Sequence, residues 1–204
     1  FFGQAGLLEE EIADDYYQQL QKEYLYLAHK FSLQRMEAAT WRFLRTRPGN
    51  FPHVRIAQLA WMFYKENALL SRLLEAPDAD AVRKILSART SEYWETHYMF
   101  GEPSARRTKS LSASTQDLLI INTVCPFLFA YGRHRADETM PQRALAFLET
   151  LKPENNYIVR QWLQCGLEVE NAGDSQALIQ LKKMYCDARK CLYCRIGYEY
   201  LRQR

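Results

Sequence analysis

The spacing of apolar positions along the 204-residue chain indicates helices almost throughout. Early in the chain, apolar residues recur at steps of four, three and four residues, at Leu20, Tyr24, Leu27 and Phe31. This spacing predicts a first helix from about Leu8 to Phe31. Its acidic start suits the positive end of the helix dipole.

Proline and glycine mark the breaks in this pattern. Pro48, Gly49 and Pro52 stop any helix near residue 50. The least regular stretch is SEYWETHYMFGEPSARRTKSLSAS, from Ser91 to Ser114, where Gly101, Pro103 and a run of Ser, Arg and Lys predict a long surface loop. We therefore expect a compact all-α domain without a substantial sheet, in which residues 1–100 and 113–204 form two helical lobes.

The stretch STQDLLIINTVCPFLFAYG, from Ser114 to Gly132, is apolar on nearly every side. This predicts a central buried helix that kinks or weakens at Pro126 and stops at Gly132. No window holds eighteen apolar residues, so we expect no membrane span. The start of the chain has neither a signal peptide nor an initiator Met, which predicts a cytoplasmic fragment of a longer protein with reduced thiols.

Charge is distributed unevenly around a net value of only +3. Residues 1–24 hold six acidic side chains against one basic, whereas residues 35–55 hold five basic against one acidic. Residues 182–204 hold seven basic against two acidic. The two basic stretches are either solvated helix surfaces or contacts for an anionic partner such as nucleic acid.

Thiols crowd into the last twenty residues of the chain. The string YCDARKCLYCRIG there places Cys186, Cys191 and Cys194 within nine positions, while Cys165 lies upstream. Thiolates bind zinc and iron–sulfur clusters because both prefer soft sulfur donors. The fourth donor is Cys165, Cys125, a His or absent. The alternative is that the thiols are inert and pack like small apolar side chains.

The thiol layout is similar to the cluster loop of helix-hairpin-helix DNA glycosylases, whose four cysteines also lie near the end of a helical domain. It departs from that pattern because the first gap is shorter and no cysteine follows Cys194. The glycine-rich hairpin with which that family grips DNA is also missing from this sequence.

Two polar features complete the candidate chemistry. The turn RTRPGNFPHVR offers guanidinium groups and free N–H groups to a phosphate, or else forms an ordinary helix start. Polar residues inside otherwise apolar helices are expected to form structural hydrogen bonds or to line a pocket. This polar set comprises Asn50, Asp117, Asn122, Asn155, Asn156 and Arg160.

Several long strings resemble the bacterial domain-of-unknown-function 2851 family. They are FGQAGLLE at Phe2–Glu9, RPGNFPHVRIAQLA at Arg47–Ala60, INTVCPFLFAYG at Ile121–Gly132, KPENNYIVRQW at Lys152–Trp162, and DSQALIQLKKMYC with CLYCRIG at Asp174–Gly197. The resemblance implies a longer protein of which this chain is the C-terminal half, with an upstream half similar to restriction-endonuclease-like folds. It implies no activity, so no catalytic residue is predicted.

We therefore expect a helical accessory domain that binds nucleic acid and serves a nuclease-like upstream region. The expected phosphate contacts are Arg45, Arg47, Arg55, Lys182, Lys183, Arg189 and Lys190. The alternative is a structural or protein-interaction module whose thiols are inert or hold zinc. A small-molecule enzyme that uses the Arg47–Arg55 turn and Asn122 is a third possibility, which a deep polar pocket would favour.

Overall fold

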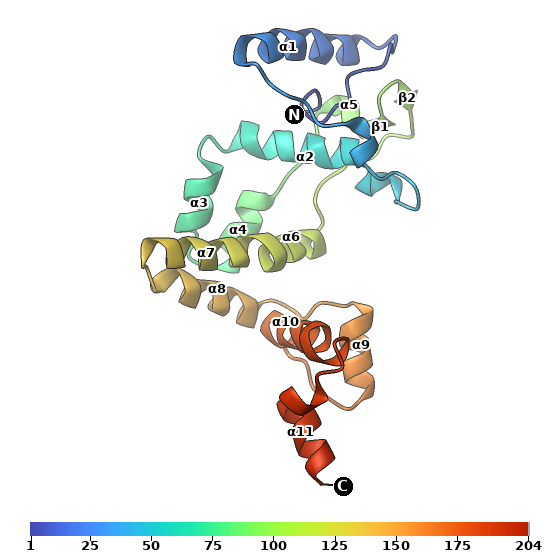
Figure 1. Cartoon of the computed structure of the whole chain (residues 1–204). Coiled ribbons are helices and arrows are strands. Elements are labelled where there is room, and N and C mark those ends of the chain that lie inside the picture. The colour runs from blue at the N-terminus through green and yellow to red at the C-terminus, as the bar shows by residue number, and fades with distance from the viewer. Residues whose placement is uncertain (204) are drawn as a thin grey trace. The chain divides into compact units, whose positions relative to one another are not determined.

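Helices make up most of the structure, a computed structural model that describes residues 1–203 (Figure 1). The only strands in this described part form one short hairpin, which confirms the predicted all-α class. The chain divides into two compact units. Unit 1 comprises Phe1–Leu73 and Lys84–Ala113, and unit 2 comprises Leu74–Arg83 and the chain from Ser114 onward.

The first helix is shorter than the sequence predicts. Helix α1 spans Asp15–Phe31, because the side chain of Asp14 caps it by accepting a hydrogen bond of 2.8 Å from the backbone N–H of Tyr17. The preceding residues form an irregular segment in which Phe2, Ala5 and Leu8 are buried. The expectation that the helix starts near Leu8 is therefore wrong, since these apolar residues pack as a loop.

The rest of unit 1 follows the predicted breaks. Two 3₁₀ turns, Ala38–Thr40 and Pro48–Asn50, precede the other helices and the strands of unit 1. They are α2 (Pro52–Lys65), α3 (Leu69–Glu75), α4 (Ala79–Leu86), α5 (Glu92–Glu95), β1 (His97–Met99) and β2 (Glu102–Pro103). The stretch predicted as one long loop thus contains the antiparallel hairpin β1–β2. Helices α3 and α4 each run across the division between the two units.

Aromatic rings form the core of unit 1. Trp94 is 1% exposed and stacks on Phe2 with a centroid distance of 5.1 Å, and Phe100 meets Trp94 edge-on at 5.0 Å. Tyr17 contributes the inner face of α1 and is also 1% exposed. Since offset and edge-to-face ring pairs add to the free energy of burial, this cluster joins the N-terminal segment to α5 and the hairpin.

Unit 2 contains the remaining helices. They are α6 (Ala113–Leu119), a π-helical turn (Ile120–Val124), α7 (Cys125–Arg135), α8 (Thr139–Thr150), α9 (Tyr157–Gln164) and α10 (Ala172–Leu181). A second π-helical turn (Lys182–Cys186), a 3₁₀ turn (Cys191–Tyr193) and α11 (Arg195–Arg202) follow. Helices α7 and α8 lie side by side, as do α9 and α10 (Figure 1).

The continuous helical run Ala113–Arg135 differs from the expected central helix in two ways. It does not stop at Gly132, where an added Cβ would lie 2.5 Å from Pro141 Cδ, so this glycine permits the close approach of α8. The run is also buried along one stripe only, which includes Ile120, Val124 and Leu128. The π-helical turn just before Pro126 accommodates a residue that cannot donate a backbone hydrogen bond.

Ala113–Arg135 is also the one helical run within residues 1–203 that is long and apolar enough to cross a membrane. Its apolar window has a mean hydropathy of 1.2 and is 28% buried. Length and composition alone are weak evidence, because core helices of soluble proteins meet the same test. The absence of a membrane span stays a prediction from the sequence.

Candidate functional site

Three of the four predicted thiol ligands meet at one small apolar pocket in unit 2. Cys186, Cys191 and Cys194 line a space of about 140 Å³ together with Trp162 and Tyr185. Cys186 and Cys191 are exposed, whereas Cys194 is buried. The backbone of Cys191 packs directly on Gly197, where an added Cβ would lie 2.6 Å from the Cys191 carbonyl oxygen. The sequence cluster is therefore a spatial cluster as well.

The other two thiols do not join this pocket. Cys165 is exposed at the end of α9 and Cys125 is buried in α7, where desolvation raises the pKa of its thiol to about 12. Across the described residues, no three His, Cys, Asp or Glu side chains lie close enough to hold one metal ion. The zinc or iron–sulfur site of Cys165, Cys186, Cys191 and Cys194 therefore remains a prediction.

The C-terminal basic stretch carries exposed cations between exposed tyrosines. Lys183, Arg189 and Lys190 are exposed and form no ion pair among the described residues. Lys182 differs, because it donates to a carboxylate oxygen of Asp187 at 2.5 Å. The tyrosines of this stretch are exposed as well, since the exposed fraction of Tyr193 is 83%. This stretch, Lys182–Gln203, is called the C-terminal segment below.

The first arginine-rich turn is built differently. The guanidinium group of Arg55 donates to Asn50 Oδ1 at 2.5 Å and to Gln58 Oε1 at 2.9 Å, so it holds the turn and the first part of α2 together. Arg45 and Arg47 are exposed, and Arg45 has a left-handed backbone with φ of 63°. Of the three arginines predicted to contact phosphate here, two extend into solvent.

The predicted polar set separates into independent pairs and one hub. Asn50 binds Arg55, and Asp117 accepts a 2.6 Å hydrogen bond from Arg83 Nε. Asn155 accepts a 3.0 Å hydrogen bond from Arg160. Each of these pairs links neighbouring segments of one unit.

Glu154 is the hub, and its carboxylate accepts hydrogen bonds from carboxamide groups and forms no ion pair within residues 1–203. Asn122 and Asn156 each donate to it at 3.2 Å, and Gln176 donates at 2.5 Å. The backbone N–H of Glu154 also donates to Ser175 Oγ at 3.1 Å. Because these donors come from the π-helical turn, the start of α9 and α10, the network joins three segments of unit 2.

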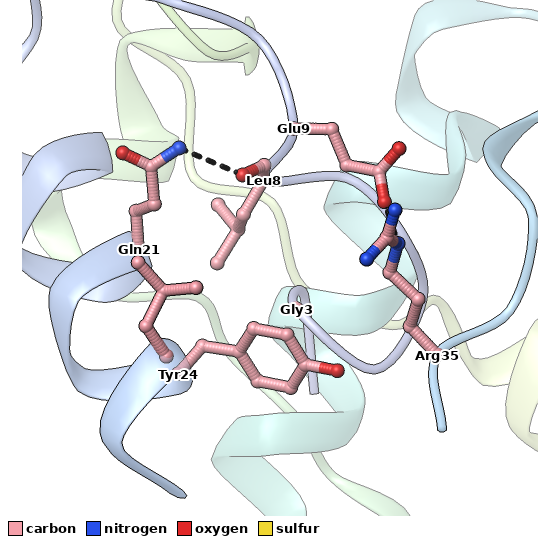
Figure 2. Close-up of a pocket in the computed structure, with 7 residues that line it drawn as sticks. Gly3, Leu8, Glu9, Gln21, Tyr24 and Arg35 are labelled. Atoms are coloured by element: carbon pink, nitrogen blue, oxygen red, sulfur yellow. Dashed lines mark hydrogen bonds and ion pairs between the residues drawn. The ribbon is translucent and has the colours of Figure 1, made fainter. Parts of the chain in front are cut away.

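Unit 1 contains a cavity of about 370 Å³ beside α1 (Figure 2). Gln21 donates to the Leu8 carbonyl oxygen at 2.8 Å on one side, and Glu9 forms an ion pair with Arg35 on the other. The ring of Tyr24 extends across the floor beneath Gly3. A Cβ on Gly3 would lie 1.9 Å from that ring, so the glycine lets the N-terminal segment rest on it.

A second cavity of unit 1, of about 330 Å³, holds the residue that the sequence analysis missed. His53 lines this cavity, is 6% exposed, and its Nδ1 has no hydrogen-bond partner among the described residues. Desolvation lowers the pKa of its imidazole to about 4. The position of His53 beside Val54 and three residues before Ile56 was the available signal, since that spacing places it on the apolar face of α2.

The helical fold, the polar hub and these cavities define a mostly helical domain. The chain belongs to the family described as Protein of unknown function (DUF2851), whose model matches residues 1–157. No curated protein and no solved structure shows a significant match to the chain. The matched span includes both cavities of unit 1, whereas the thiol pocket and the C-terminal segment lie beyond it.

Proposed function

We propose that this chain is an accessory domain that binds single-stranded nucleic acid through its C-terminal segment. The observation that carries the proposal is the alternation of cations with exposed tyrosines along Lys182–Gln203. Lys183, Arg189 and Lys190 form no ion pair among the described residues, whereas Lys182 pairs with Asp187 and Arg195 with Glu199. Cations neutralise phosphates, while aromatic faces stack on unpaired bases of any sequence. Arg45 and Arg47 in unit 1 would add phosphate contacts.

The experiment is fluorescence anisotropy with a labelled single-stranded oligonucleotide at several salt concentrations. The test variant combines Lys183→Glu, Arg189→Glu and Lys190→Glu, and the control variant combines Lys22→Glu, Arg89→Glu and Lys152→Glu, which are exposed cations elsewhere. Both variants change the net charge equally, so only the position of the charges differs.

We expect the unmodified chain to bind more weakly as salt rises. In the test variant, the slope of log affinity against log salt should fall by about 2, because each single-strand phosphate contact contributes roughly 0.7. The control variant should keep most of the affinity. Equal binding by the test variant and the unmodified chain would contradict the proposal, as would equal losses in the two variants.

The accessory role extends this proposal to the longer protein that the family resemblance implies. In that protein, this chain would form the C-terminal half and would hold nucleic acid for a nuclease-like upstream region in the cytoplasm. The full-length protein should then cleave nucleic acid less efficiently when it carries the same three charge reversals.

One observation favours a second candidate function, a protein-interaction module. Apolar side chains of the C-terminal segment are also exposed, with exposed fractions of 70% for Leu192, 56% for Ile196 and 47% for Leu201. Such a surface suits a partner protein, and the adjacent thiols would then be inert or would hold zinc as a staple. Salt-independent retention of a partner by the chain, lost on Leu192→Ser with Ile196→Ser, would favour this candidate.

A further inference from the structure

The 330 Å³ cavity of unit 1 combines an aromatic wall with acidic groups. Phe43, His53 and Phe100 contribute rings, and the carboxylate residues Glu9, Glu10 and Glu102 also line it. The ring centroid of His53 lies 5.6 Å from that of Phe43 and 5.1 Å from that of Phe100. The volume equals about eleven water molecules and lies at the lower end of the range for small-molecule pockets.

The carboxylates that line this cavity are not balanced by basic lining residues. None of its lining residues is Lys or Arg. Glu9 is neutralised by its ion pair with Arg35, whereas Glu10 and Glu102 form no ion pair within residues 1–203. Burial keeps the His53 imidazole uncharged at neutral pH, because its pKa is lowered to about 4. The cavity therefore combines negative carboxylates with aromatic rings, and no basic side chain is among its lining residues.

The spacing of these groups favours one class of cation over another. Although His53 and three carboxylates line the same cavity, no three such side chains in the described part lie close enough to bind one metal ion. A metal ion needs oxygen or nitrogen ligands within about 2.0–2.6 Å, whereas a substituted ammonium ion contacts rings and carboxylates at van der Waals distances. The cavity fits the larger cation.

Two glycine turns fix the shape of the cavity before any ligand binds. Gly6 has φ of 70°, and a Cβ there would lie 2.3 Å from the Met36 carbonyl oxygen. Gly101 has φ of 69°, and its N–H donates to the Tyr93 hydroxyl at 3.1 Å, which in turn donates to Asp14 Oδ2 at 2.9 Å. Walls held in this way need little rearrangement when a ligand binds, which lowers the conformational-entropy cost of binding.

We propose that this cavity binds a small organic cation, an alkyl-substituted ammonium ion, between the rings of Phe43 and Phe100 and the carboxylates of Glu10 and Glu102. The unpartnered, buried imidazole of His53 forms an uncharged part of the wall. This site lies wholly in unit 1 and does not depend on the nucleic-acid proposal, which concerns unit 2.

The test uses a matched pair of probes on the whole chain. Choline carries the substituted ammonium ion, and 3,3-dimethylbutan-1-ol has nearly the same shape without the charge. Isothermal titration calorimetry measures both affinities. We expect choline to bind at least about tenfold more tightly than the alcohol, because only the cation is attracted to the carboxylates and ring faces.

Matched variants locate the binding site. Glu10→Gln with Glu102→Gln should weaken choline binding about tenfold, whereas Glu11→Gln with Glu168→Gln removes two exposed carboxylates outside the cavity and should leave it unchanged. All four side chains are exposed, so the variants should fold. Three results would each overturn the proposal. They are equal affinities for choline and the alcohol, no choline binding up to about 10 mM, and equal effects of the two double variants on choline binding.

Discussion

The aromatic core of unit 1 and the C-terminal segment use similar residues in opposite ways. Both are rich in tyrosine and large apolar side chains, yet Trp94 and Tyr17 are 1% exposed while Tyr193 is 83% exposed. Hydrogen bonds of unit 1 connect distant positions, such as Trp41 Nε1 to the Ala5 carbonyl oxygen at 2.7 Å. Those of the C-terminal segment are local, such as Tyr198 N–H to the Cys194 carbonyl oxygen at 2.8 Å.

This difference shows that burial by neighbouring side chains, and not composition, decides what an aromatic side chain does. In unit 1, rings covered by other rings contribute burial free energy and form the walls of a cavity. In the C-terminal segment, uncovered tyrosines beside unpaired cations remain available to a ligand. The predictions below test whether the two regions are as different in energy and reactivity as they are in exposure.

The largest expected effect is loss of stability when the core of unit 1 is opened. Trp94→Ala should lower the free energy of unfolding by about 3–5 kcal/mol, because it removes a buried aromatic side chain and leaves a cavity. Tyr193→Ala, at an exposed position, should change it by no more than about 0.5 kcal/mol. Urea denaturation followed by circular dichroism measures the free energy of unfolding of both variants. Similar losses in the two variants would contradict the expected difference in stability between the two regions.

A smaller effect concerns pH and the buried imidazole of His53. Its pKa falls from 6.5 to about 4 because of desolvation, so the unfolded chain binds a proton between these values that the folded chain does not. Stability should therefore decrease as pH falls through this window, by about 3 kcal/mol in total. Above pH 6.5 the contribution of His53 to the free energy of unfolding no longer changes with pH.

The variant His53→Leu isolates this contribution. Glu9, Glu10 and Glu102 line the same cavity and are present in both proteins, so the difference between the two pH profiles of unfolding free energy reports on His53. The variant should show a shallower decrease between pH 6.5 and 4. An unchanged slope would show that this imidazole takes up its proton in the folded chain as readily as in the unfolded one.

The smallest effect is on thiol reactivity and requires no change in stability. Cys165, Cys186 and Cys191 are exposed and should react rapidly with a maleimide, whereas Cys125 and Cys194 are buried and should react only after unfolding. Mass spectrometry after brief labelling identifies the modified thiols. Rapid labelling of Cys125 in the native chain would contradict its burial and its raised pKa.

The same measurement addresses the metal prediction. A zinc ion or iron–sulfur cluster held by the thiols would protect Cys186 and Cys191 from the maleimide. Elemental analysis of anaerobically purified protein should then find close to one zinc, or the iron of one cluster, per chain. Less than about 0.2 metal per chain would rule out a tightly held thiolate site.

Much of the fold followed from local patterns. The helices after residue 113 were predictable because cap residues, prolines and apolar spacing agree there, as at Asn171, whose side chain caps α10. The start of α1 was not predictable, because Leu8 fits a helical face but is used in a loop that packs against α1. The hairpin β1–β2 is too short to leave a period-two pattern.

The candidate sites were predictable only where residues are close in sequence. The thiols Cys186, Cys191 and Cys194 meet because they lie within nine positions, and the cations of the C-terminal segment are grouped for the same reason. The acidic aromatic cavity was missed, because Glu10, Phe43 and Phe100 reach it from three separate segments.

The sequence by itself determined that the chain is helical, where most helices end, and where basic residues and thiols gather, because these properties depend on neighbours within a few positions. Tertiary structure alone decided which aromatic residues are covered, that Glu154 binds three carboxamides, and that His53 is buried without a partner for Nδ1. Coverage and partnership depend on contacts between distant segments, and a local pattern does not specify which segments will meet.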